Sequence, residues 1–74
     1  MNATAEYTVI LEHGKGGWSA YVPDLPGCVA AAHSSACTET LIREAIALHI
    51  RAMRADGDPV PPATSEALMV AVPA

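Results

Sequence analysis

The 74-residue chain contains no phenylalanine and only four basic residues, against eight acidic ones. A protein that follows a nucleic-acid backbone neutralises phosphates with clustered lysine and arginine side chains. A chain with four such side chains and a net charge of −4 cannot supply a basic stripe. We therefore expect no direct nucleic-acid binding. The acidic balance suits a basic protein partner, and it is equally ordinary as the solubility charge of a small domain.

Long apolar runs are absent as well. No segment approaches the roughly 20 apolar residues that cross a bilayer, and the N-terminus lacks a basic segment followed by an apolar one. Cysteine is scarce, because Cys28 and Cys37 are the only two and do not form a C-x-x-C pair. We expect two free thiols in a reducing compartment, no membrane association and a cytoplasmic protein.

Residues with metal-binding or catalytic chemistry are few. Cys28, His33 and Cys37, together with His13, are acceptable zinc ligands. Their Cys-x4-His-x3-Cys spacing does not match that of a zinc knuckle. Cys37 and His33 are the one Cys–His pair that could activate a nucleophile, and such a pair is common by chance. We expect no enzyme activity, no metal and no cofactor.

What the sequence does have is a high apolar content, 51% hydrophobic residues against 16% charged ones. A chain of this length forms one domain, here residues 1–74, and buries only about 60% of its unfolded surface. That leaves more apolar side chains than a small monomer hides comfortably. We therefore predict a homo-oligomer, most simply a twofold dimer.

Strands are predicted by period-2 alternation of apolar and polar residues at 5–12 and 18–22. Three glycines within 13–17 predict a hairpin loop between these strands. An alanine-rich third strand is expected at 28–33, and its small side chains let a helix lie close on either face. Residues 1–4 carry no pattern and are expected to fray.

A rigid corner separates the second and third predicted strands. Pro23 and Pro26 fix the backbone and remove two donors, and Gly27 can take a positive φ. We interpret this corner as structural and not as a binding loop.

One helix is predicted after the third strand. Ser34 or Ser35 supplies an N-cap, Glu39 is expected in the first turns, and the helix runs to about Ala55. Gly57 is the expected C′ residue.

The apolar arc of this helix spans about 200°, roughly twice what packing on one sheet requires. Two stripes make up the arc, and one of them should face a second surface. The first stripe holds Leu41, Ala45, Leu48 and Ala52. The second, our candidate oligomer interface, holds Ile42, Ile46, His49, Ile50 and Met53. A strand-edge pairing is the alternative interface, and the sequence does not choose between them.

Beyond the helix, prolines at 59–62 predict a stiff extended connection. Leu68, Val70 and Val72 alternate with smaller or more flexible residues, which predicts a last strand. The predicted fold class is α+β, with the antiparallel order β-β-β-α-β in one sheet and one helix packed on it.

These features occur in an order that resembles a known family. A hairpin containing Tyr7 and Trp18 precedes the Pro-Asp-Leu-Pro-Gly-Cys run at 23–28, a short strand, one helix ending near Asp-Gly, and a Pro-Val-Pro exit. From about Tyr7 to about Pro62 the chain resembles the N-terminal domain of HicB antitoxins, which has a partial ribonuclease H-like fold. The corner, the hairpin and the helix from 41 to 53 match the structural core of that domain.

The resemblance implies a function without chemistry. HicB proteins are bacterial antitoxins that bind HicA, a small basic toxin that has a double-stranded-RNA-binding fold and cuts messenger RNA. Contact with such a toxin would use shape and charge, and the candidate partner-binding residues are Glu6, Glu12, Trp18, Tyr21 and Asp24.

Two departures from the family pattern keep an alternative open. Full-length members append a DNA-binding domain, for which the 74 residues leave no room, so operator binding is not expected. The Gly-Asp-Thr common before the helix is replaced by Ala-His-Ser-Ser at 32–35. The alternative is a stand-alone structural or regulatory homo-oligomer without a toxin.

Overall fold

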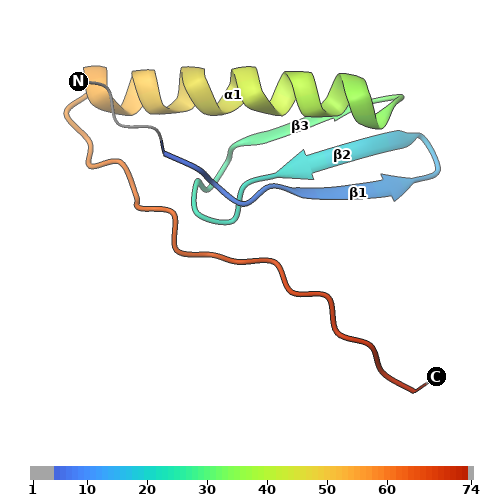
Figure 1. The fold of residues 1–74 in the computed structure, drawn as a ribbon. Helices are drawn as coiled ribbons and strands as arrows, with labels where there is room; N and C mark the ends of the chain where they lie inside the picture. The colour runs from blue at the N-terminus through green and yellow to red at the C-terminus, as the bar shows by residue number, and fades with distance from the viewer. Residues whose placement is uncertain (1–4, 74) are drawn as a thin grey trace.

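The structure is a computed structural model that describes residues 5–73. These residues form one three-stranded antiparallel sheet with a single helix across one face (Figure 1). The elements are, in chain order, β1 (Ile10–Gly14), β2 (Gly17–Tyr21), β3 (Val29–Ala32) and α1 (Ser35–Ala55). The predicted α+β class is confirmed, with the strands in the sheet order β1-β2-β3. The N-terminal residues expected to fray lie outside the described part of the chain.

The hairpin between β1 and β2 is tighter than the sequence suggests. Only Lys15 and Gly16 remain in the loop, because Gly14 and Gly17 already pair across the ladder. At Gly17 a side chain is excluded, since a Cβ atom would lie 2.6 Å from the carbonyl oxygen of Ala32 in β3. The first strand begins at Ile10 and not at Ala5, and the residues before it are extended without a ladder partner.

Small side chains on β2 and β3 bring α1 close to the sheet. Ala20 of β2 stands opposite Ala30 of β3, and both lie on the face that α1 covers. The sequence allowed the helix to pack on either face of β3. The structure places it over Cys28 and Ala30, while Val29 points the other way and is 64% exposed.

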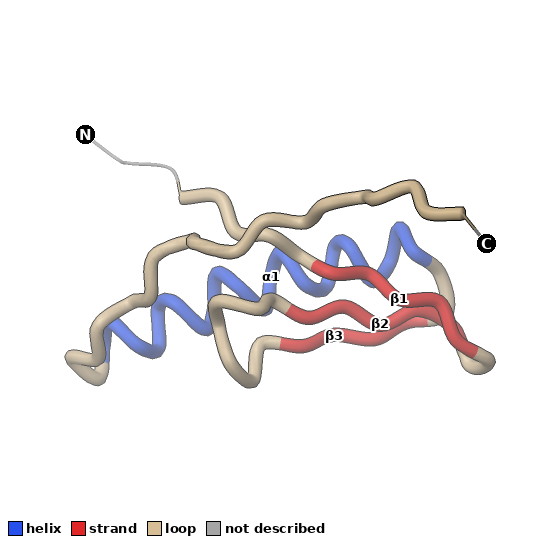
Figure 2. The backbone as a smooth tube through the Cα atoms, turned by 90° about the horizontal axis from the view of Figure 1, so that it is seen from below, coloured by secondary structure: helices blue, strands red, loops and turns tan. Residues whose placement is uncertain are grey.

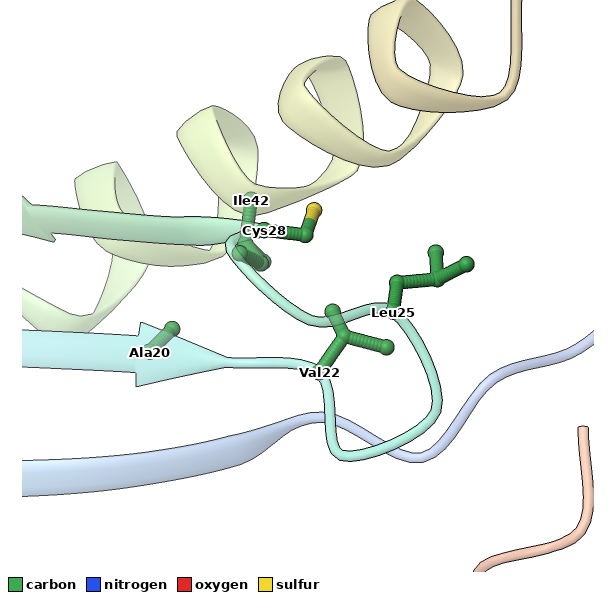
Figure 3. Packing of buried hydrophobic residues seen from close by; sticks show 5 residues of the cluster. All are labelled: Ala20, Val22, Leu25, Cys28 and Ile42. Carbon is green, nitrogen blue, oxygen red and sulfur yellow. The ribbon is translucent and has the colours of Figure 1, made fainter. Parts of the chain in front are cut away.

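The hydrophobic core is small and centred on the corner. Its buried apolar residues are Ala20, Val22, Leu25, Cys28 and Ile42 (Figure 3). Three of the five belong to the corner between β2 and β3. The corner is closed by its own backbone bonds, in which Leu25 N donates to Val22 O at 3.1 Å and Cys28 N donates to Leu25 O at 3.0 Å. These bonds hold Leu25, which is 0% exposed, against the rest of the core.

Both ends of α1 are capped as the sequence predicts. At the N-terminus the Ser34 hydroxyl accepts a bond from the Cys37 backbone N–H at 3.1 Å. At the C-terminus Gly57 N donates to Arg54 O and Asp58 N donates to Met53 O, which is the Schellman pattern.

Glu39 lies within the first two turns of α1 as expected, although the first turn itself contains no acidic residue. Glu39 lies one residue beyond that turn and pairs with Arg43, at 2.7 Å between carboxylate and guanidinium. An exposed i,i+4 pair of this kind stabilises a helix by a few tenths of a kcal/mol. The first turn is held instead by Thr38, a fully buried residue whose hydroxyl donates to Ser34 O at 2.8 Å.

The last predicted strand is wrong for the isolated chain. Residues 59–73 form an extended segment without a strand, which runs away from the sheet on the β1 side (Figure 2). Leu68 and Val72 in that segment are 83% and 70% exposed. The alternating pattern was correct for an extended chain, but a strand also needs a neighbouring edge, and the anchored part of the segment directs the rest away from one.

Asp24 fixes that anchored part of the segment. We call Asp24, Thr64 and Ser65 together the Asp24 clamp. One oxygen of the Asp24 carboxylate accepts the backbone N–H groups of Thr64 and Ser65, both at 2.9 Å. The other oxygen accepts their hydroxyl groups at 3.1 and 2.8 Å. Four donors therefore converge on one carboxylate in the corner.

Two further bonds tie the same segment to the chain ahead of β1. The Tyr7 hydroxyl donates to Pro61 O at 2.6 Å, and the Thr8 hydroxyl donates to Ser65 O at 2.6 Å. The C-terminal segment is thus attached to the body of the protein up to Ser65.

The Asp24 clamp should depend on pH. Hydrogen bonds from Ser65 and then Thr64 hold the pKa of Asp24 below its usual value. Because the folded pKa is depressed, the contribution to stability is complete above the unfolded pKa near 3.9 and is lost as pH falls through the folded pKa. We expect the amide resonances of Thr64 and Ser65 to titrate together in that acidic window.

The same clamp can be broken at neutral pH by Asp24→Asn, which removes the charge and one acceptor. The amide protons of Thr64 and Ser65 should then exchange faster with solvent. Asp58→Asn, which loses the same charge at an exposed position, is the control. Equal protection in both variants would show that Asp24 does not hold the segment.

The corner prediction can be tested at Gly27. This residue has a φ of +85°, and no atom beyond its chain neighbours lies within 4 Å of the position that a Cβ would take, so a side chain there meets backbone strain without a clash. Gly27→Val should lower the free energy of unfolding by about 1–3 kcal/mol. Gly14→Val, in an open position of β1 without positive φ, is the matched control. Equal midpoints of denaturant unfolding in the two variants would contradict the structural role of Gly27.

Candidate partner-binding surfaces

The sheet has one face that no described helix or strand covers. Side chains alternate across the strands, so the residues that point away from α1 form what we call the open face. Its members are Ile10, Glu12, Ser19, Tyr21, Val29 and Ala31. Tyr21 pairs with Ile10 on one side and with Val29 on the other, which makes an apolar row across all three strands. Tyr21 and Val29 are 41% and 64% exposed, so this row is accessible to a partner.

The structure brings together two of the five predicted partner-binding residues. Glu12 and Tyr21 both lie on the open face. Glu6 precedes β1 and is exposed, and Asp24 is occupied by the clamp. Trp18 lies on the helix side of β2, opposite Ala32.

Trp18 has an intramolecular role in this arrangement. Its ring stacks on that of His13, the residue opposite it in the hairpin, with centroids 4.5 Å apart and planes 10° from parallel. The stack covers the apolar face of the indole and stiffens the end of the hairpin. Trp18 is accordingly half-buried.

Sequence reasoning missed the apolar members of the open face. The alternation at 5–12 does not by itself show that Ile10 faces a partner, and the alanine-rich strand at 28–33 leaves open which of its faces the helix covers. The available signal was the position of Val29 within an alanine-rich strand, where a large apolar side chain stands alone among small ones. Its exposure could not be known before the position of α1 was known.

A second surface lies between β1 and α1, and we call it the β1 groove. It is a depression of about 470 Å3. Its apolar lining residues are Tyr7, Val9, Leu11, Ile42 and Ile46, and its charged rim residues are Glu6, Glu39 and Arg43. It runs along the outer edge of the sheet, where the backbone of β1 faces no other strand.

The residues predicted for an oligomer interface mostly turn towards the sheet. Ile42 is 1% exposed and belongs to the core, so its side chain is not available to a second chain. Ile46 and Ile50 are half-buried against the core, and His49 and Met53 are also half-buried. The other stripe supplies the exposed leucines of the helix, Leu41 at 42% and Leu48 at 61%. Thr38 explains this choice, since it is buried at the helix start and Ile42 follows one turn later on the same side.

The remaining reactive groups are not assembled into a site. Cys28 is buried and Cys37 is exposed, both as free thiols. Burial raises the pKa of the Cys28 thiol above its ordinary value. Between residues 5 and 73, no three His, Cys, Asp or Glu side chains gather closely enough to hold a metal ion. No helix within residues 5–73 combines the length and the apolar content that crossing a membrane requires.

Comparisons with known proteins agree on one family. No curated protein matches this chain. A solved structure described as a HicA3 and HicB3 toxin–antitoxin complex contains a chain with 32% sequence identity and a TM-score of 0.68, and the match covers 80% of this chain and 70% of that one. Residues 7–74 match the family model of the HicB-like antitoxins of bacterial toxin–antitoxin systems. The match spans the hairpin, the corner, the helix and the clamped segment, and the chain therefore belongs to the HicB-like antitoxin family.

Proposed function

We propose that this chain is an antitoxin that neutralises a HicA-like toxin by binding it through the open face of the sheet. The observation that supports this most directly is its likeness to a chain of a toxin–antitoxin complex, at 32% identity over most of both chains. Membership of the HicB-like family points the same way. The open face is the surface of suitable chemistry that the fold leaves uncovered.

The composition of the open face suits a protein interface. Stable interfaces place apolar and aromatic side chains at the centre and polar side chains at the rim. Here Tyr21 lies at the centre of the apolar row, and Glu12 lies towards the hairpin end beside Ser19. Tyrosine is among the residues that most often dominate binding energy. A partner centred on Tyr21 would bury Val29 and Ile10 at the same time.

Neutralisation by this route requires no catalysis from the antitoxin. A chain with net charge −4 attracts a basic toxin over a distance and accelerates the encounter. Once bound, it excludes RNA from the covered surface by its volume. Rim charges such as Glu12 mainly set the association rate, so binding should slow as salt is raised, while the apolar centre sets the lifetime of the complex.

The test is a substitution at the centre of the open face. Val29→Asp places an unpaired carboxylate where the toxin would remove water, which is costly. We expect at least a tenfold weaker complex, about 1.4 kcal/mol, by isothermal titration with the purified toxin. Leu48→Asp makes the same kind of change on the outer face of α1, where the leucine is 61% exposed, and should bind as the unaltered chain does.

Growth provides a second measurement. The toxin is expressed together with each variant, and the unaltered chain and Leu48→Asp should relieve the arrest that the toxin causes. Val29→Asp should fail while remaining folded by circular dichroism. If a folded, soluble, unaltered chain relieves nothing, the stand-alone oligomer becomes the better assignment. The exposed apolar segment beyond the Asp24 clamp is the observation that favours that second function.

A further inference from the structure

We propose that residues 66–73, the arm, form a β strand along the β1 edge of a second copy of this chain. In this exchange Leu68, Val70 and Val72 enter the β1 groove of the second copy. The second copy returns its own arm by twofold symmetry. The predicted last strand would then exist only in the dimer.

The apolar side chains of the arm are exposed to solvent in the single chain, where burying them would be favourable. Their exposed fractions are 83% for Leu68, 96% for Met69, 65% for Val70 and 70% for Val72. The arm carries a single charge, at Glu66. An alternating apolar segment without a strand partner can add to an exposed sheet edge as a further strand.

The chain is less compact, and exposes more surface, than a typical domain of its length. A compact domain of 74 residues has a radius of gyration of about 11 Å, whereas this chain has 14.1 Å and a longest extent of 46 Å. A compact monomer of 7.6 kDa exposes about 4,300 Å2, whereas this chain exposes 5827 Å2. The difference is of order 1,500 Å2 per chain, or about 3,000 Å2 for a pair of chains, which falls in the range of roughly 2,000–5,000 Å2 that obligate homodimers bury in total.

The β1 groove provides a matching receptor. The outer edge of β1 offers unpaired backbone donors and acceptors, which is the requirement for adding a strand. Alternate side chains of an added strand point to the helix side of the sheet, because side chains change face at every residue. They would meet Val9, Leu11 and Ile46, the apolar lining of the groove.

The arm does not occupy the β1 groove of its own chain in this structure. The Asp24 clamp and Thr8 fix the segment at Ser65, and beyond that point the arm diverges from its own sheet (Figures 1 and 2). Every chain carries one arm and one groove, so a twofold pair satisfies both without leaving a free edge on either β1.

The chemistry of the groove suits the arm of a second copy. Its rim contains both charge signs, with Glu39 paired to Arg43 at 2.7 Å. The groove lining itself is apolar and lies beside an unpaired strand edge, which matches the nearly uncharged, alternating arm. The open face, in which Glu12 is the one charged residue, remains free for the toxin in such a dimer.

The first test compares two valines of equal exposure. Val70→Asp lies in the arm, and Val29→Asp lies on the open face, at 65% and 64% exposed. By sedimentation at micromolar concentration, the unaltered chain and Val29→Asp should be dimers, and Val70→Asp should be a monomer of 7.6 kDa. A monomeric unaltered chain would overturn the proposal, as would a dimer that survives Val70→Asp and is lost in Val29→Asp.

The second test identifies the groove. In a Cys37→Ser background, a chain with Val70→Cys is mixed with a chain with Leu11→Cys and treated with a mild oxidant. A disulfide between the two introduced cysteines should form, identified by mass spectrometry of the linked peptides. The control replaces Leu11→Cys by Leu48→Cys, on the outer face of α1. Linkage to position 48 and not to position 11 would overturn the assignment of the groove, and linkage within one chain of a Val70→Cys, Leu11→Cys double variant would show that the arm closes on itself.

These tests separate the inference from the proposed function. Val29→Asp should lose the toxin and keep the dimer, whereas Val70→Asp should lose the dimer and keep measurable toxin binding. Two results together would overturn the exchange: the unaltered chain is a monomer, and Val70→Asp abolishes toxin binding. The arm would then contact the toxin and not a second copy.

Discussion

The corner between β2 and β3 is the constraint on which the rest of the molecule depends. Two adjacent residues of the corner point in opposite senses: Leu25 is fully buried in the core, and the Asp24 carboxylate accepts four bonds from Thr64 and Ser65. The prolines on either side, Pro23 and Pro26, restrict the backbone that presents them. The corner therefore fixes both the packing of the helix and the place where the C-terminal segment leaves the body.

Local signals explain what the sequence predicts well. Ser34 and Gly57 mark the ends of α1 because capping is a property of a few neighbouring residues. The hairpin and the corner follow from glycine and proline in the same way. What could not be predicted depends on tertiary contact. Both stripes of α1 are apolar, and only packing on the sheet decides that Thr38 and Ile42 are buried while Leu48 is exposed.

The candidate site shows the same division between local and tertiary information. The alternation that includes Tyr21 gives its place on a strand, but the open face becomes a surface only when α1 occupies the other side. Asp24 looks like a free acidic group in the sequence, because its four donors lie 40 and 41 residues further along the chain. The last strand fails for the converse reason: its alternating pattern is that of a strand, but the segment beyond Ser65 has no strand beside it in this chain.

Because the core is small, the two proposed contacts would affect the stability of the chain differently. Among residues 5–73, five apolar side chains and Thr38 are buried, which is little for a domain of this length. Arm exchange would add burial along the β1 groove, beside Ile42, so the stability of each chain would rise with its own concentration. Toxin binding at the open face would instead leave the core as it is. A dimer of this kind presents two open faces on one rigid body, and the exchange would thereby serve the antitoxin by supplying the scaffold on which those faces are held.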